Sequence, residues 1–68
     1  MEIKVGDTVE VTHGTYQGMV EKVISIHPDP HFSIYPLVKI YTGSIRVDGW
    51  EKPCYDLLSV TAVKRKPQ

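Results

Sequence analysis

The chain has little cysteine, no long apolar run and no excess of charge of either sign, and each shortage excludes a class of protein. Cys54 is the only cysteine among the 68 residues, so a fold held together by internal disulfides is excluded. No stretch approaches the roughly 18 consecutive apolar residues of a membrane span. The N-terminal residues show no apolar core of a signal peptide. We therefore expect a soluble, cytoplasmic protein with no membrane contact.

The charges balance in total but not along the chain. Eight basic and eight acidic side chains give a formal net charge of zero. Three of the basic residues lie at positions 64–66, so residues 1–63 carry five basic and eight acidic groups, a net charge of −3. This part of the chain lacks the basic excess that is typical of nucleic-acid-binding domains. We take residues 1–63 as one domain and residues 64–68 as a short, solvated basic tail.

The first half of the sequence predicts two strands around a glycine loop. Residues 8–12 alternate polar and apolar side chains, which places their two valines on one face, and we expect Val5 to cap the same core. Residues 13–18 predict a loop whose two glycines adopt the positive φ of tight turns. Residues 19–27 form the longest strand candidate, with a bulge or strong bend that lets both of its faces contribute to a core.

The second half predicts a strand, two turns and return strands. Residues 37–42 form a strand with Val38 and Ile40 inward and its Lys and Tyr outward. Gly43-Ser44 predicts a tight turn, and Asp48-Gly49 predicts a second. The remaining elements are a return strand edged by Pro53 at 50–55, a single 3₁₀ turn at 56–58 and a closing strand at 59–63. About five short antiparallel strands at this spacing are typical of a small closed barrel.

The opening segment resembles a known motif. Residues 5–11 read Val-Gly-Asp-Thr-Val-Glu-Val, Gly14 follows, and residues 18–23 read Gly-Met-Val-Glu-Lys-Val. This order resembles the KOW motif, which opens the SH3-like domains of NusG-type transcription factors and several ribosomal proteins. The resemblance implies an SH3-like barrel with a short 3₁₀ turn before the last strand, and RNA binding in transcription or translation. Two departures concern the loop after Gly14, which lacks basic residues, and residues 43–55, which are longer and more aromatic than the usual hairpin.

A second, partial resemblance is to an enzyme family. Gly6-Asp7-x-Val9 and Tyr16-Gln17-Gly18 are similar to segments of the plasmid-borne type II dihydrofolate reductases, SH3-like proteins that build their site around the pore of a tetramer. Their Val-Gln-Ile-Tyr segment has Ser33-Ile34-Tyr35-Pro36 as its nearest counterpart, which lacks the glutamine and precedes the third strand. Such a pore enzyme is the remote third alternative.

Histidine, cysteine and carboxylate side chains do not form a pattern of recognisable chemistry. His27 and His31 flank a Pro-Asp-Pro turn, and together with Cys54 they lack the paired spacing of a zinc site. Cys54 lacks the orienting group and oxyanion motif that nucleophilic catalysis requires. We expect no metal, no cofactor, no small-molecule substrate and no catalysis.

Aromatic side chains provide the candidate binding site. They fall mostly in loops or at outward positions, where aromatic rings stack on bases or anchor protein partners. Trp50 is the central candidate, although Trp50 and Phe32 could instead cap the ends of the barrel. Three basic residues on outward faces add positive charge. The residues expected to bind a partner are Tyr16, Gln17, Lys22, Tyr35, Lys39, Tyr41, Arg46, Trp50 and Tyr55.

Two binding functions follow from these features. The first is a non-catalytic module that docks on a protein or an RNA–protein assembly of transcription or translation. The alternative is a protein–protein or oligomerising module with no nucleic-acid role, which the net charge of −3 on residues 1–63 favours. The sequence leaves open the identity of the partner, the choice between RNA and protein, and the oligomeric state.

Overall fold

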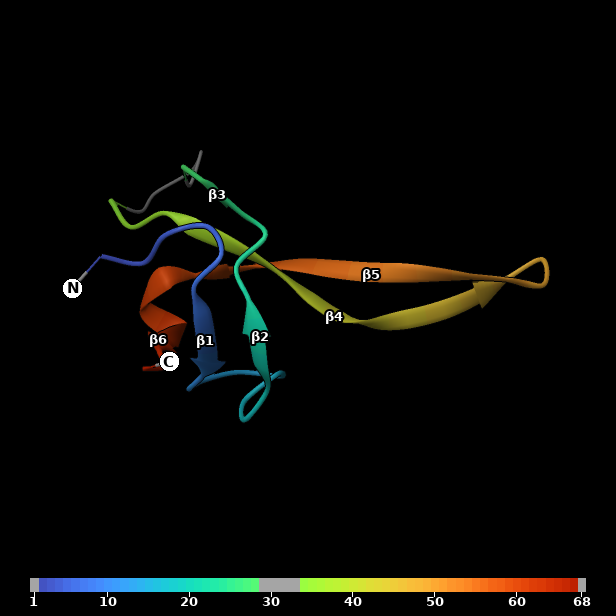
Figure 1. Cartoon of the computed structure of the whole chain (residues 1–68), viewed down its shortest axis with the longest axis horizontal. Helices are drawn as coiled ribbons and strands as arrows, with labels where there is room; N and C mark the ends of the chain where they lie inside the picture. Colours follow the sequence, from blue (N-terminus) through green and yellow to red (C-terminus); the bar gives the residue numbers. More distant parts are fainter. Residues whose placement is uncertain (1, 29–33, 68) are drawn as a thin grey trace.

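The described part of the chain is all-β, which confirms the expected fold class. The computed structural model describes residues 2–28 and 34–67. These residues form two three-stranded antiparallel sheets with strand orders β2–β1–β6 and β3–β4–β5 (Figure 1). The elements are β1 (Thr8–Val11), β2 (Val20–Lys22), β3 (Ser25–His27), β4 (Leu37–Val47), β5 (Trp50–Ser59), the 3₁₀ helix η1 (Val60–Ala62) and β6 (Val63–Arg65).

The sheets do not close into a barrel, so the expected closed barrel of about five strands is wrong for the described residues. Residues 2–28 and 34–67 form six strands, and among these strands no pairing joins one sheet to the other. The chain crosses between the sheets at Val23 and Ile24, within the segment expected to be one strand. Val23 N donates to Asp7 O at 2.9 Å, whereas Ile24 N donates to Lys39 O at 2.9 Å. Two successive backbone amides thus donate to different sheets. The segment 19–27 is therefore divided into β2 and β3.

The core is small and lies between the two sheets. The alternation expected for residues 8–12 and 37–42 is confirmed, because their inward residues are all buried. Val5 is 61% exposed, so the expectation that it caps the core is wrong. It lies in a turn in which Asp7 N donates to Lys4 O, and Ile3 packs against the core instead. The buried hydrophobic residues are Val9, Val11, Val23, Val38, Ile40 and Val63.

A long hairpin made by β4 and β5 extends well beyond this core (Figure 1). Its pairing runs from Leu37 opposite Ser59 to Val47 opposite Trp50. The expected turn at Asp48-Gly49 is confirmed, since both residues have positive φ (51° and 81°). The expected turn at Gly43-Ser44 is wrong, because β4 continues through it with a bulge between Tyr41 and Gly43. We call residues 43–54 the hairpin arm.

The C-terminal elements follow the expected order, with a 3₁₀ turn before the last strand, but at different positions. Residues 56–58 belong to β5 rather than to a 3₁₀ turn, and the 3₁₀ helix η1 follows at Val60–Ala62, where Ser59 Oγ accepts from Thr61 N at 3.2 Å. The boundary expected at residue 63 falls at the start of β6, which pairs with β1. Arg65 and Lys66 form ion pairs with Asp7 and Glu10 at 3.5 and 3.4 Å.

Helices contribute little to the described residues. None of those residues belongs to a helix of the length and hydrophobicity that a membrane crossing requires.

A candidate binding surface on the hairpin arm

One face of the hairpin arm is largely apolar and faces water, with Lys52 as its one charged residue. The register places Ile45 opposite Lys52, Val47 opposite Trp50 and Gly43 opposite Cys54. Residues two apart in a strand share a face, so this is the same face that carries Leu58 against the core nearer the body. Beyond the body the core no longer covers it: Ile45, Val47 and Trp50 are 54%, 37% and 75% exposed. We call Ile45, Val47, Trp50 and Cys54 the apolar arm face.

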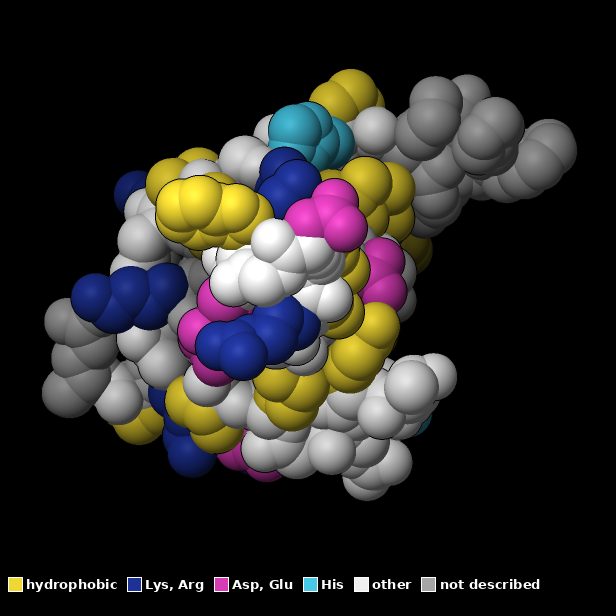
Figure 2. Space-filling model, turned by 90° about the vertical axis from the view of Figure 1, so that its right-hand side faces the viewer, with side chains coloured by type: hydrophobic (Ala, Val, Ile, Leu, Met, Phe, Trp, Pro, Cys, Tyr) yellow, Lys and Arg dark blue, Asp and Glu magenta, His cyan; other side chains and the backbone are white. Residues whose placement is uncertain are grey.

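The tip of the arm carries balanced charges. Asp48 lies in the turn, and Glu51 follows Trp50. Glu51 accepts a hydrogen bond from Ser44 Oγ at 2.7 Å and lies opposite Arg46. Figure 2, which faces the end of the molecule that carries the tip, shows hydrophobic, basic and acidic side chains gathered together. Together with Lys52 the arm has two basic and two acidic residues, and therefore no excess of either charge.

The opposite face of the hairpin carries an aromatic cluster. Tyr41 and Tyr55 lie opposite each other, with ring centroids 6.0 Å apart and ring planes at 72°. Lys39 Nζ lies 5.1 Å from the centroid of the Tyr55 ring, a cation–π geometry. Leu57, opposite Lys39, is exposed on the same face. We call Lys39, Tyr41 and Tyr55 the outward cluster.

The sequence suggested that Tyr16 is an exposed aromatic residue in a loop, and the structure contradicts this. It is partly buried and packs against the core. Hydrogen bonding to the Asp56 carboxylate and the negative charge of that group raise the pKa of the Tyr16 phenol above its ordinary value, with burial contributing in the same direction. Asp56 belongs to β5, so this contact joins the β1–β2 loop to the base of the hairpin.

The nine expected binding residues do not form one surface. Lys39, Tyr41 and Tyr55 lie together, and the register extends their face to Arg46 further along the arm. Trp50 lies on the other face, at the tip. Tyr16 lies at the base of the arm, near Asp56 and Cys54. The remaining expected residues lie outside the arm: Gln17, Lys22 and Tyr35.

Trp50 does not cap an end of the body, because it lies at the tip of the arm and is 75% exposed. Phe32, the other proposed cap, lies outside the described residues. The exposure of Trp50 could not be predicted from the sequence, because the sequence does not show that the hairpin extends beyond the core.

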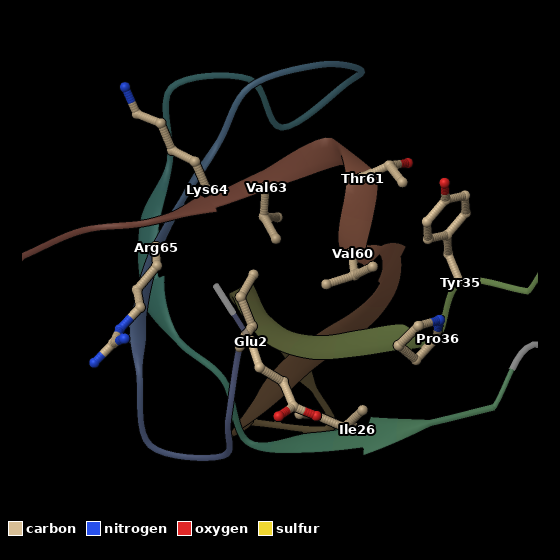
Figure 3. Close-up of a pocket in the computed structure, with 10 residues that line it drawn as sticks. Glu2, Ile26, Tyr35, Pro36, Val60, Thr61, Val63, Lys64 and Arg65 are labelled. Carbon is tan, nitrogen blue, oxygen red and sulfur yellow. The ribbon is translucent and has the colours of Figure 1, made fainter.

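A hollow that the sequence analysis missed lies between the two sheets at the other end of the molecule (Figure 3). Its volume is about 680 Å³. Val60 and Val63 point into it, whereas the charged ends of Lys64 and Arg65 point away. The hollow exists because the sheets do not close, which the spacing of the strands does not reveal. Its lining residues are Glu2, Ile3, Ile26, Tyr35, Pro36, Val60, Thr61, Val63, Lys64 and Arg65.

The residues considered for metal binding lie in different surroundings. His27 Nε2 lies 2.7 Å from Ser25 Oγ on β3, and Cys54 is partly buried on the arm. His31 lies outside the described residues. Within residues 2–28 and 34–67, no group of three or more His, Cys, Asp or Glu side chains is placed to hold a metal ion.

Comparisons of this chain with protein families, with curated proteins and with solved structures find no match. The KOW-type resemblance of residues 5–23 therefore stays a prediction.

Proposed function

We propose that this chain is a non-catalytic binding module that docks on a protein assembly through its hairpin arm. In this proposal the body is of the SH3-like, KOW-type class, and the assembly belongs to transcription or translation, as the resemblance of residues 5–23 implies. The observation that carries the proposal is the apolar arm face. It projects beyond the core and leaves a tryptophan three-quarters exposed. Tryptophan is enriched among the few residues that dominate the binding energy of protein interfaces.

The electrostatics of the arm favour a protein partner over a nucleic acid. Arg46 and Lys52 are matched by Asp48 and Glu51 within the arm. Nucleic-acid affinity depends on several basic groups that contact phosphates, and the arm offers no surplus of them. A largely apolar strip that contains one lysine and has charges of both signs beside it is instead typical of a protein interface.

RNA binding is the second candidate, and the outward cluster supports it. Lys39 beside two tyrosines combines a cation with aromatic rings, the groups that contact phosphates and stack on bases. This cluster lies on the opposite face of the hairpin from Trp50 and outside the arm, so substitutions can test the two candidates separately.

The test compares three immobilised chains for retention of a partner from an extract of the source cells: wild type, Trp50→Ala and Leu57→Ala. Leu57 is an exposed apolar residue on the outward face, so its variant is a matched control. We expect wild type and Leu57→Ala to retain the same protein and Trp50→Ala to bind it about 30-fold more weakly, as for a hot-spot residue. Equal retention by all three chains contradicts the proposal, and a partner released by ribonuclease would favour RNA.

A further inference from the structure

An exposed apolar side chain and a hollow lie at opposite ends of the molecule. The tip of the arm presents Trp50 as an exposed apolar knob, and the hollow lies at the opposite end, beside η1, β6 and the start of β4. The arm tip and the hollow are therefore too far apart to meet within one chain. The tip of one copy can reach only the hollow of another.

The hollow suits an aromatic side chain in size and chemistry. Its volume of about 680 Å³ falls within the range of roughly 300–1,000 Å³ that is usual for ligand pockets. Ile3, Ile26 and Val60 contribute apolar atoms to its lining, and Val63 forms its floor against the core. A buried Trp side chain removes about 150–250 Å² of surface from water. The hydrophobic effect would therefore favour entry of the indole into this hollow.

Both ends carry charges of both signs: Arg46, Asp48, Glu51 and Lys52 lie near the tip, and Glu2, Lys64 and Arg65 line the hollow. Asp48 lies two residues before Trp50 at the tip, and Lys64 borders the hollow with its charged end pointing away from it (Figure 3). Arg65 is paired with Asp7. Lys64 is exposed and has no carboxylate partner among the described residues. An ion pair between Lys64, at the rim of the hollow, and Asp48 of an entering arm would therefore break no existing ion pair.

We infer that Trp50 of one copy enters the hollow of a second copy, so that this chain associates head to tail with itself. The inference rests on the proposed function, because it uses the arm as the contact, and it names the partner as another copy. The two surfaces differ, so the contact is heterologous, and repetition of it produces a ring or a filament rather than a closed pair.

Two variants separate the two halves of this contact. Trp50→Ala removes the knob and leaves the hollow intact. Thr61→Arg places a long charged side chain at the hollow and leaves the knob intact. Thr61 is exposed; the substitution removes the 2.8 Å hydrogen bond between its Oγ1 and Ser59 Oγ but keeps the hydrogen bond from its backbone N to Ser59 Oγ. Circular dichroism checks that both variants are folded, and Leu57→Ala is the matched control.

The experiment is sedimentation equilibrium over a concentration series for each chain and for a one-to-one mixture of the two variants. We expect wild type and Leu57→Ala to associate as concentration rises, and each contact variant alone to associate at least tenfold more weakly. The mixture should form a complex of twice the 7.7 kDa of one chain and no larger species. Each such complex has one knob in one hollow and no second contact to extend it.

Trp50 is the only tryptophan in the chain, so its fluorescence gives an independent readout. Emission should shift to shorter wavelength as wild type associates, and also when Thr61→Arg is mixed with Trp50→Ala, because the indole leaves water. No shift in that mixture overturns the inference.

Three sedimentation results also overturn it: a wild type that is monomeric throughout, a mixture that stays monomeric, or Thr61→Arg associating like wild type, which would mean arm-to-arm contact. A monomeric wild type leaves docking on a different protein standing, since that proposal fails only if Trp50→Ala retains its partner.

Discussion

At the scale of single residues, the contact between Tyr16 and Asp56 joins the loop after β1 to the base of the hairpin. Asp56 raises the pKa of the Tyr16 phenol through hydrogen bonding and its negative charge. The folded chain thus holds this proton to higher pH than the unfolded chain does. The free energy of unfolding should therefore fall as pH rises from the unfolded value of about 10 through the higher folded pKa. We expect Asp56→Asn to lower the Tyr16 pKa towards its ordinary value, as measured by the ¹³Cζ chemical shift of Tyr16.

Glu51→Gln is the control for this titration, because it removes a carboxylate from the arm rather than from its base. It should leave the Tyr16 pKa as in wild type. The assignment of the cause to Asp56 is wrong if Asp56→Asn and wild type titrate alike.

Residue-level prediction from the sequence succeeded where alternation was regular. Val9 and Val11, like the inward pair of β4, could be assigned because polar neighbours separate them and only one face can be buried. Val20 and Ile24 could not be assigned to a face in this way, because residues 19–27 carry apolar side chains at both odd and even positions. The sheet crossing at Val23 decides which of them face inward, and this crossing depends on the partners Asp7 and Lys39 from distant strands.

At the scale of elements, the turn at Asp48-Gly49 should control the order of the arm. Gly49 has a φ of 81°, and an alanine in left-handed backbone costs about 1–2 kcal/mol. None of the buried core residues lies in the arm, so we expect this cost to open the arm locally. Gly49→Ala should speed amide hydrogen exchange within residues 43–54 about 5- to 30-fold, with a smaller effect on β1. Asp48→Asn is the control, since asparagine also tolerates positive φ. Unchanged exchange in Gly49→Ala would mean that the turn does not limit arm opening.

The same hairpin shows why one of the two predicted turns is correct and the other is wrong. Both Gly43-Ser44 and Asp48-Gly49 have turn composition, yet only the second reverses the chain. Pairing on both sides of Gly43 holds it in the ladder, and its φ of 132° is used at the bulge. Similarly, residues 56–58 resemble a 3₁₀ turn locally but pair with residues 38–40 of β4. Long-range pairing overrides local composition in each case, and a single sequence does not contain it.

At the scale of the whole molecule, the chain consists of a body with a small core and an arm that adds no buried residue to it. The radius of gyration is 12.7 Å, compared with about 11 Å for a compact chain of this length. The all-β class was predictable from the short Val- and Ile-rich segments. Strand spacing alone could not distinguish a closed barrel from two open sheets, because closure depends on pairs that the sequence does not specify.

This division predicts that the body folds without the arm. Tyr41 lies opposite Tyr55, so replacing residues 42–54 with Asn-Gly leaves two paired strands joined by a two-residue turn of favoured composition. All six buried hydrophobic residues remain, and a shorter loop lowers the entropy cost of closure only slightly. Urea unfolding should therefore stay cooperative, with a free energy within about 1 kcal/mol of wild type, the size of a modest change in loop length.

The shortened chain should at the same time lose every interaction assigned to Trp50, both retention of a protein partner and head-to-tail association, while its hollow still accepts the arm of Thr61→Arg. A shortened chain that fails to fold would mean that the arm stabilises the body. A shortened chain that folds and still self-associates would move the interface onto the body itself. A shortened chain that folds but no longer binds would show that the body provides the stability and the arm provides the recognition. The arm could then be replaced without destabilising the core.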